Sequence, residues 1–169
     1  MAFATSSQIG VDLNNPSTTQ LFTLNQEIFG SDGSIWQYGL STAVLVTGQL
    51  VFIAPQGTAI PLSTGNIAAS TAGLNIAAAQ FAVSSTQYAF FAKQGTNLYL
   101  LCSGTVPPTT SLAFSATSGA LITAGLAAVG NTAAGIYITT SASTGTLSAA
   151  IGIMTFPRAA PATASTPMS

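Results

Sequence analysis

Charged residues are the scarcest feature of this 169-residue chain. It holds two lysines or arginines and three aspartates or glutamates, so 3% of its residues are charged, where an average soluble domain has about 25%. So little charge cannot keep copies apart by repulsion, and the surface must consist largely of small and neutral polar residues. Such a surface suits contact with other protein. Lys93 and Arg158 alone cannot form the basic stripe that nucleic-acid binding requires, so we expect no nucleic-acid partner.

Histidine is absent altogether. The usual general base, the Ser-His and Cys-His nucleophile pairs and the commonest metal ligand are therefore missing. Glu27 and Asp32 could approach each other across a hairpin, and the alternative interpretation is a solvated edge charge and a turn residue. Asp12 begins a stretch of oxygen-bearing residues that is too short for a calcium loop. We therefore predict that the protein is not an enzyme and has no catalytic, cofactor-binding or metal-binding residue.

Two single residues have a structural and a chemical interpretation. Cys102 is the one cysteine, so no intrachain disulfide can form. We interpret it as a small buried apolar residue, because no cation flanks it to activate the thiol. Lys93 lies in an apolar ribbon, where it would discourage aggregation at the edge of a sheet. An isopeptide bond from Lys93 to an asparagine is the alternative.

Targeting and membrane signals are weak. The first seven residues have neither a positive region nor a continuous apolar region, so we expect no secretory signal. Residues 119–138 are long enough for a membrane helix, but they contain four glycines and polar residues and have no flanking lysine or arginine. We therefore expect no membrane partner.

Residues 21–53 are the stretch around which the chain is organised. Asp32-Gly33 lies between two runs of β-forming residues, and this dipeptide is the strongest short-range signal for a hairpin. After the turn, Trp36, Tyr38 and Leu40 alternate with other residues, as the period of a strand requires. The pattern predicts a β-hairpin in which Trp36 is largely buried.

Further short strands are predicted along the chain. The first is 50–54. Because Pro61 has no backbone N–H, the run 59–62 is predicted to be an edge strand or a loop. The others are 74–83, a second hairpin of 87–93 and 97–102 around a turn at 94–96, then 112–115, 136–140 and 147–156, the last ended by Pro157. Residues 120–129 leave a short helix open. Many short strands separated by turns predict an all-β fold, an antiparallel β-sandwich or barrel of jelly-roll type.

The domain organisation follows from the composition of the ends. Residues 1–20 are polar and aperiodic, so we expect an extended N-terminal arm, either disordered or ordered only against a neighbouring subunit. Residues 21–158 form the β-domain. Residues 159–169 are of low complexity and are expected to be a flexible C-terminal tail or arm.

Four segments, taken in order, carry a family resemblance. They are Phe29-Gly-Ser-Asp-Gly33 followed by Trp36-Gln-Tyr38, Leu45-Val-Thr-Gly-Gln-Leu-Val51, Ala82-Val-Ser-Ser-Thr-Gln-Tyr-Ala-Phe-Phe91 and Ala149-Ala-Ile-Gly-Ile-Met-Thr-Phe-Pro-Arg158. Over residues 21–158 the chain resembles the small decoration, or cement, proteins of tailed-bacteriophage heads.

The resemblance implies a structural protein on the outer capsid surface of a virion. Its partners would be the major capsid protein, whose neighbouring subunits it clamps, and other copies of itself in a dimer or trimer. No cofactor is implied. The alternative is a phage tail, fibre or surface β-module that binds a host receptor or glycan.

Overall fold

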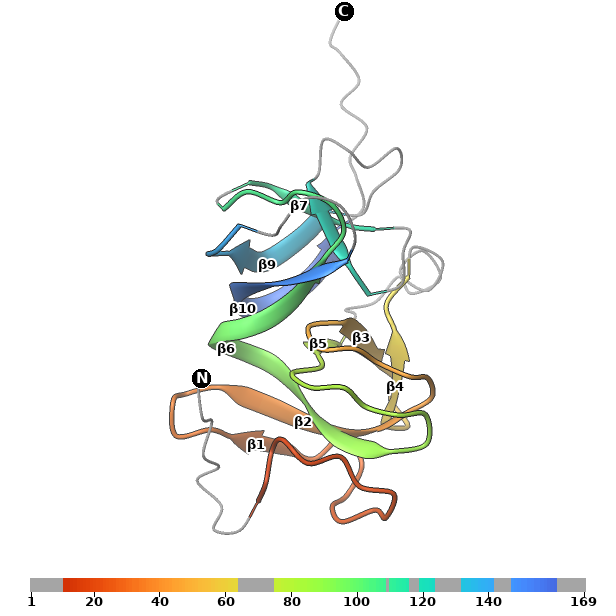
Figure 1. Cartoon of the computed structure of the whole chain (residues 1–169). Helices are drawn as coiled ribbons and strands as arrows, with labels where there is room; N and C mark the ends of the chain where they lie inside the picture. The colour runs from red at the N-terminus through yellow and green to blue at the C-terminus, as the bar shows by residue number, and fades with distance from the viewer. Residues whose placement is uncertain are drawn as a thin grey trace, which may run out of the picture.

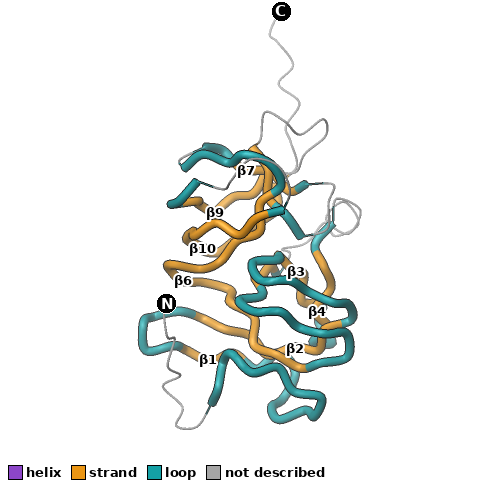
Figure 2. The backbone as a smooth tube through the Cα atoms, in the orientation of Figure 1, coloured by secondary structure: helices purple, strands orange, loops and turns teal. Residues whose placement is uncertain are grey.

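A computed structural model describes residues 11–63, 75–108, 110–115, 119–123, 132–141 and 147–160, apart from the side chains at positions 156 and 158–160. Every regular element within these ranges is a β-strand (Figure 2). The strands are β1 (Glu27–Phe29), β2 (Ile35–Ser41), β3 (Leu50–Ile53), β4 (Thr58–Pro61), β5 (Ile76–Ala78), β6 (Tyr88–Cys102), β7 (Leu112–Phe114), β8 (Leu121–Thr123), β9 (Thr132–Ile138) and β10 (Ser148–Ala160). The predicted all-β fold is confirmed.

The ten strands form one continuous sheet that closes on itself twice. Its order is β1-β2-β4-β3-β5-β6-β10-β9-β7-β8, with additional pairings of β2 with β6 and of β6 with β8. The first additional pairing closes β2, β4, β3, β5 and β6 into a ring, and the second closes β6, β10, β9, β7 and β8. The long strand β6 belongs to both rings and runs from one to the other (Figure 1). The fold is therefore a barrel architecture in which one strand is shared.

The first hairpin forms as predicted. β1 and β2 pair antiparallel, with Phe29 opposite Ile35. Gly33 closes the turn with φ +79°, a conformation that glycine adopts at little cost, and its N–H donates to the carbonyl of Gly30 at 3.1 Å. Trp36 is 3% exposed, which confirms its predicted burial.

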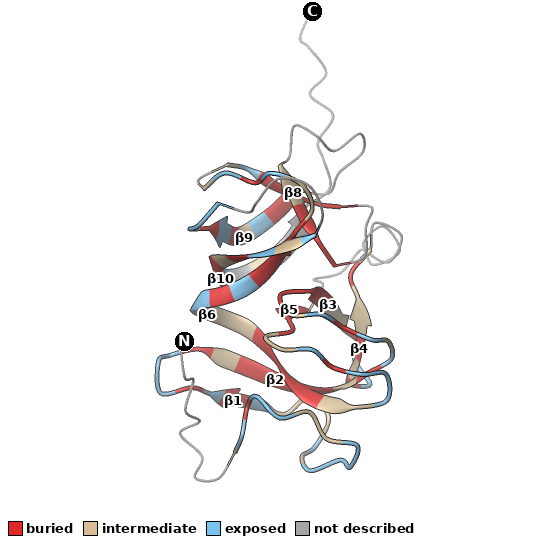
Figure 3. Ribbon diagram, in the orientation of Figure 1, coloured by how far each residue is buried: buried red, intermediate tan, exposed pale blue. Residues whose placement is uncertain are grey.

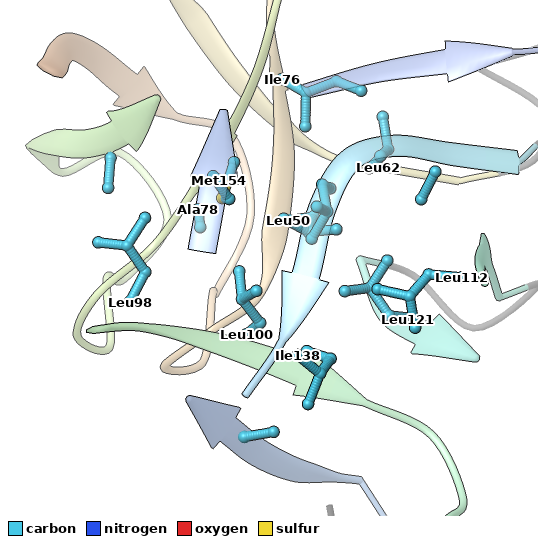
Figure 4. Close-up of a cluster of buried hydrophobic side chains, with 14 of the residues drawn as sticks. Leu50, Leu62, Ile76, Ala78, Leu98, Leu100, Leu112, Leu121, Ile138 and Met154 are labelled. Atoms are coloured by element: carbon cyan, nitrogen blue, oxygen red, sulfur yellow. The ribbon is translucent and has the colours of Figure 1, made fainter. Parts of the chain in front are cut away.

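Two clusters of buried side chains make the core. The smaller one fills the first ring and is rich in alanine, as a narrow barrel interior requires: Leu45, Val51, Ile53, Ala59, Ala77, Ala79, Val83, Ala89 and Phe91. The larger one lies between the outer side of the first ring and the interior of the second. Figure 4 shows side chains of both rings in it, among them Leu50 and Ile76 of the first ring and Leu98, Ile138 and Met154 of the second. The rings thus share one apolar layer.

The predicted second hairpin is wrong, because residues 88–102 form the single strand β6. Its first half pairs with β2 and its second half with β10, and the register against β10 shifts where Gly95 is paired and Asn97 has φ +58°. Glycine and asparagine serve bulges as well as tight turns. The local signal for an irregularity at 94–97 was right. The strand does not turn back there, and a bulge redirects β6 from one ring to the other.

Both prolines that were expected to limit strands lie inside them. Pro61 is the last residue of β4, which is paired on both sides and is not an edge strand. The pairing of β4 with β2 reaches only Thr58 and Ala59, so Pro61 lies beyond that ladder. β10 continues past Pro157 because its register against β9 shifts between Met154 and Arg158, which leaves Pro157 out of the paired positions. A bulge tolerates the missing N–H.

The part of the expected N-terminal arm that the structure describes packs on its own domain. Leu13 is 2% exposed in the larger core cluster, and Ser17 exchanges backbone hydrogen bonds of 2.9 and 2.7 Å with Tyr88. For residues 11–20, the interpretation as a disordered tail or as an arm ordered only by a neighbour is therefore wrong. Residues 1–10 and 161–169 lie outside the described residues.

Other strand boundaries differ from expectation. β5 is shorter than the predicted strand 74–83, and β9 begins at Thr132, before the start of the predicted strand 136–140. Where a short helix was left open at 120–129, the described residues 121–123 are strand β8, and 124–129 lie outside the described ranges. No helix able to span a bilayer occurs among the residues that the structure describes.

Candidate functional site

The described carboxylates Asp12, Glu27 and Asp32 are dispersed, and each has a different partner. Asp12 accepts the backbone N–H of Asn14 at 3.0 Å. Asp32 accepts the N–H and the hydroxyl of Ser34, as a turn residue does. Glu27 forms an ion pair with Lys93, so the two acids that could have met across the hairpin have different partners. No cluster of residues that could hold a metal ion occurs in the described part of the chain.

Lys93 does not lie on an edge strand. It falls in β6 where the register against β2 shifts, between the pairs of Trp36 with Ala92 and of Ile35 with Gln94. Its ammonium group contacts the carboxylate of Glu27, which is 42% exposed, and not an asparagine beside a buried acid. The edge-strand interpretation is therefore wrong, and the contacts of Lys93 do not support an isopeptide bond.

Cys102 is a buried apolar residue, as predicted. Its side chain is fully buried in the larger core cluster, and this burial raises the pKa of the thiol to about 11. The ionised form that reacts with oxidants and metals is therefore suppressed near neutral pH.

A chain of amide side chains joins segments of the first ring. Gln37 is 4% exposed, and its amide donates to the side-chain oxygen of Asn25 at 3.0 Å and accepts from the side-chain nitrogen of Asn75 at 2.7 Å. Asn25 in turn donates to the carbonyl of Pro55 at 2.6 Å. With its interior occupied by the smaller core cluster, this ring is a packed barrel and not a ligand cavity. These amides did not stand out in the sequence, because an isolated Asn or Gln carries no spacing signal.

The outer side of β6, β10 and β9 is the strongest candidate for a functional surface. Tyr99 lies directly opposite Ile151, and Tyr137 lies directly opposite Ile153. Opposite residues share a face of a sheet, and residues two apart on one strand share it too. We call this surface the outer apolar face and define it as Tyr99, Tyr137, Leu147, Ala149, Ile151 and Ile153. Figure 3 shows exposed positions alternating with buried ones along the second half of β6.

The inward residues of the same strands fix this face. Leu98, Leu100, Ile138 and Met154 are buried in the larger core cluster, so the intervening residues must point outward. Gly152 lies inward where a Cβ atom would approach a side-chain carbon of Leu100 and the carbonyl oxygen of Tyr137 to 2.4 Å. The three strands therefore pack closely around Gly152, directly behind the face.

The exposure of the face is high for apolar side chains. Tyr99 is 42% exposed, Tyr137 57% and Leu147 47%, while Ile151 and Ile153 are half-buried. None of the face residues is charged. Contiguous exposed apolar surface of this kind marks contact sites in soluble proteins.

The face is held against the first ring by backbone and amide contacts. The side chain of Gln80 accepts the N–H of Tyr99 at 2.8 Å and donates to its carbonyl at 3.2 Å, so it replaces a neighbouring strand. The N–H of Leu101 donates to the carbonyl of Gly48 at 2.7 Å. Val44 and Val46, in the loop that leads to Gly48, are 70% and 47% exposed. The loop that is hydrogen-bonded to β6 therefore carries two further exposed apolar side chains.

Further exposed apolar side chains lie on β1, which pairs with β2 of the first ring, and on the segment before β1. Leu21 is 64% exposed in the segment before β1, and Phe29 is 59% exposed in β1. Leu21 also borders an open hollow of about 510 Å³ whose other lining residues are Gln20, Phe22, Thr23 and Gln26. The exposed apolar side chains therefore occur on both rings.

Sequence reasoning placed Tyr99, Tyr137 and residues 147–156 on strands, but it did not bring them together as a surface. A signal was present in Leu147, Ala149, Ile151 and Ile153, which alternate with the equally apolar Ala150 and Met154. A strand that is apolar on both faces needs cover on both faces. No protein-family model, curated protein or solved structure matches the chain.

Proposed function

We propose that this chain is a structural virion protein that binds the outer surface of a phage capsid and stabilises it by bridging subunits of the major capsid protein. The observation that carries the proposal is the distribution of exposed apolar side chains over both rings, on a chain of which only 3% of the residues are charged. A bridging protein needs contact surfaces in more than one place. The Val44 and Val46 loop and the Leu21 and Phe29 positions provide such surfaces outside the outer apolar face.

Apolar contact supplies the driving force for such attachment. Each Å² of apolar surface removed from water contributes about 25 cal/mol, so a contact of several hundred Å² has ample gross energy before the cost of ordering is subtracted. A protein held at two contacts must lose both to leave, so repetition over a lattice adds avidity. With few ion pairs to screen, attachment should depend little on salt.

The resemblance of residues 21–158 to decoration proteins supports the same proposal. The absence of histidine and the dispersal of the described acidic side chains agree with a role that needs no catalytic group.

Purified particles test the proposal. We expect hundreds of copies per particle on the capsid, and we expect particles stripped of the protein to rupture at lower temperature or milder osmotic shock than complete ones. Adding the protein back should restore resistance, whereas a Val44→Asp, Val46→Asp variant should rebind weakly. Depleted capsids as robust as complete ones would contradict the proposal.

The hollow beside Leu21 favours one second candidate, a module that binds a host glycan. Gln20 and Gln26 line it, and amide side chains are suitable hydrogen-bond partners for sugar hydroxyls. This candidate predicts tens of copies on a tail or fibre, and glycan binding that is lost in Gln26→Ala.

A further inference from the structure

The outer apolar face has a pattern that repeats under a half turn. β10 is its central strand, with β6 on one side and β9 on the other, both antiparallel to β10. Tyr99 stands beside Ile151 and Tyr137 stands beside Ile153, so the two tyrosines occupy diagonal corners around Gly152. A half turn about an axis that passes through Gly152 perpendicular to the face exchanges the isoleucines with each other and the tyrosines with each other.

The other two corners carry short polar side chains. Beyond Ile151 on the β9 side lies Thr139, whose hydroxyl donates to the carbonyl of Ile151 at 2.9 Å. Beside Ile153 on the β6 side lies the bulge that contains Asn97, an exposed residue with φ +58°. Bulky and small corners therefore alternate around the central isoleucines.

We propose that the outer apolar face is a two-fold interface at which a second copy of this chain binds, with β10 packed on β10 of the partner copy. A two-fold axis that runs along β10 between the copies stacks Ile151 and Ile153 on their equivalents. The same axis places each Tyr99 over the Thr139 corner of the other copy and each Tyr137 over the Asn97 corner. A two-fold interface must be self-complementary in this way, since one surface serves both sides.

Charge and area point to the same occupant. The face residues carry no charge, so the face suits a partner that also presents no charge there, and a second copy meets that condition by identity. If a fully exposed aromatic side chain offers about 200 Å², Tyr99 at 42% and Tyr137 at 57% together offer roughly 200 Å². Leu147, Ala149 and the two isoleucines raise the apolar area to roughly half of the 800 Å² per partner typical of a stable interface. The polar corners and rim make up the remainder, as in other interfaces.

The area of the outer apolar face sets the expected affinity of the two copies for each other. A centre of this area with a neutral polar rim predicts a dimer that dissociates on dilution, in the micromolar range typical of small interfaces. The dimer concerns the isolated protein, so it is tested without particles and can fail while the proposed capsid function holds.

Sedimentation equilibrium of the full chain tests the interface. We expect a monomer–dimer equilibrium that is insensitive to salt. Tyr137→Ser should raise the dissociation constant at least tenfold, because truncation of a central aromatic residue typically has that effect. Phe29→Ser is the matched control, since Phe29 is as exposed as Tyr137 and lies outside the face, and it should leave the constant unchanged.

A single added cysteine tests the two-fold axis. Ile151→Cys places a thiol next to its equivalent and should yield a covalent dimer on mild oxidation, whereas Val44→Cys should not. Cys102 is fully buried and does not interfere. A monomer at all concentrations, a trimer, or a dimer that Tyr137→Ser leaves intact would overturn the proposal.

Discussion

Replacement of Trp36 by alanine is the most direct test of the described core. Trp36 is 3% exposed in the larger core cluster, and its indole N–H donates to the hydroxyl of Ser34 at 2.7 Å. That hydroxyl also donates to Asp32 in the turn, so one chain of hydrogen bonds joins the hairpin turn to the core. Trp36→Ala removes both the apolar contacts and the end of this chain.

The expected loss follows from the buried area. An indole buries about 200 to 250 Å², which corresponds to roughly 5 to 6 kcal/mol of transfer free energy at 25 cal/mol per Å². Partial collapse of the site lowers this, and measured Trp→Ala changes in cores cluster at about 3 to 5 kcal/mol. For a domain of this size, that corresponds to a melting temperature lower by roughly 6 to 20 °C.

The assay is urea denaturation followed by circular dichroism, because the variant has lost the only tryptophan and its fluorescence. Trp36→Phe is the matched control. It keeps most of the apolar contacts and loses the N–H donor together with part of the ring volume, while Ser34 retains Asp32 as a partner, so we expect a loss of about 1 to 2 kcal/mol. A Trp36→Ala protein within about 1 kcal/mol of wild type would refute the packing described for this core.

Four further predictions concern separate parts of the fold. Gly152→Ala should destabilise the protein by about 1 to 3 kcal/mol in urea denaturation, because the new methyl would lie 2.4 Å from a leucine carbon and a carbonyl oxygen. Gln37→Leu should cost about 2 to 3 kcal/mol by the same assay, since two asparagine amides lose their partner. Gln37→Glu should cost at least as much at neutral pH, because it buries a carboxylate against the side-chain oxygen of Asn25. Leu13→Ala should lower stability by about 2 to 4 kcal/mol, and an unchanged melting temperature would contradict the packing of residues 11–20. Burial raises the pKa of Cys102 from 9.0 to about 11, so below pH 9 both states keep the thiol proton. As the pH rises from 9 to 11 only the unfolded chain loses it, and stability should fall by up to roughly 3 kcal/mol, a slope that the Cys102→Ala variant should lack.

The sequence alone determined the class of the fold and its most local elements. The Asp32-Gly33 turn and the alternation after it were sufficient for the first hairpin, because both depend on residues a few positions apart. Composition was also sufficient to predict a surface poor in charge and a buried, unreactive Cys102. These features follow from local backbone preferences and from side-chain chemistry.

Only the tertiary structure decided how the strands are connected and which exposed residues meet. Gly95 and Asn97 are as suitable for a tight turn as for a bulge, and the pairing of β6 with β2 and then with β10 selects the bulge. Tyr99 and Tyr137 lie 38 positions apart in sequence and come onto one face through their register with β10. Strand pairing is set by hydrogen bonds and burial between distant segments, and the periodicity of one segment does not specify its neighbour.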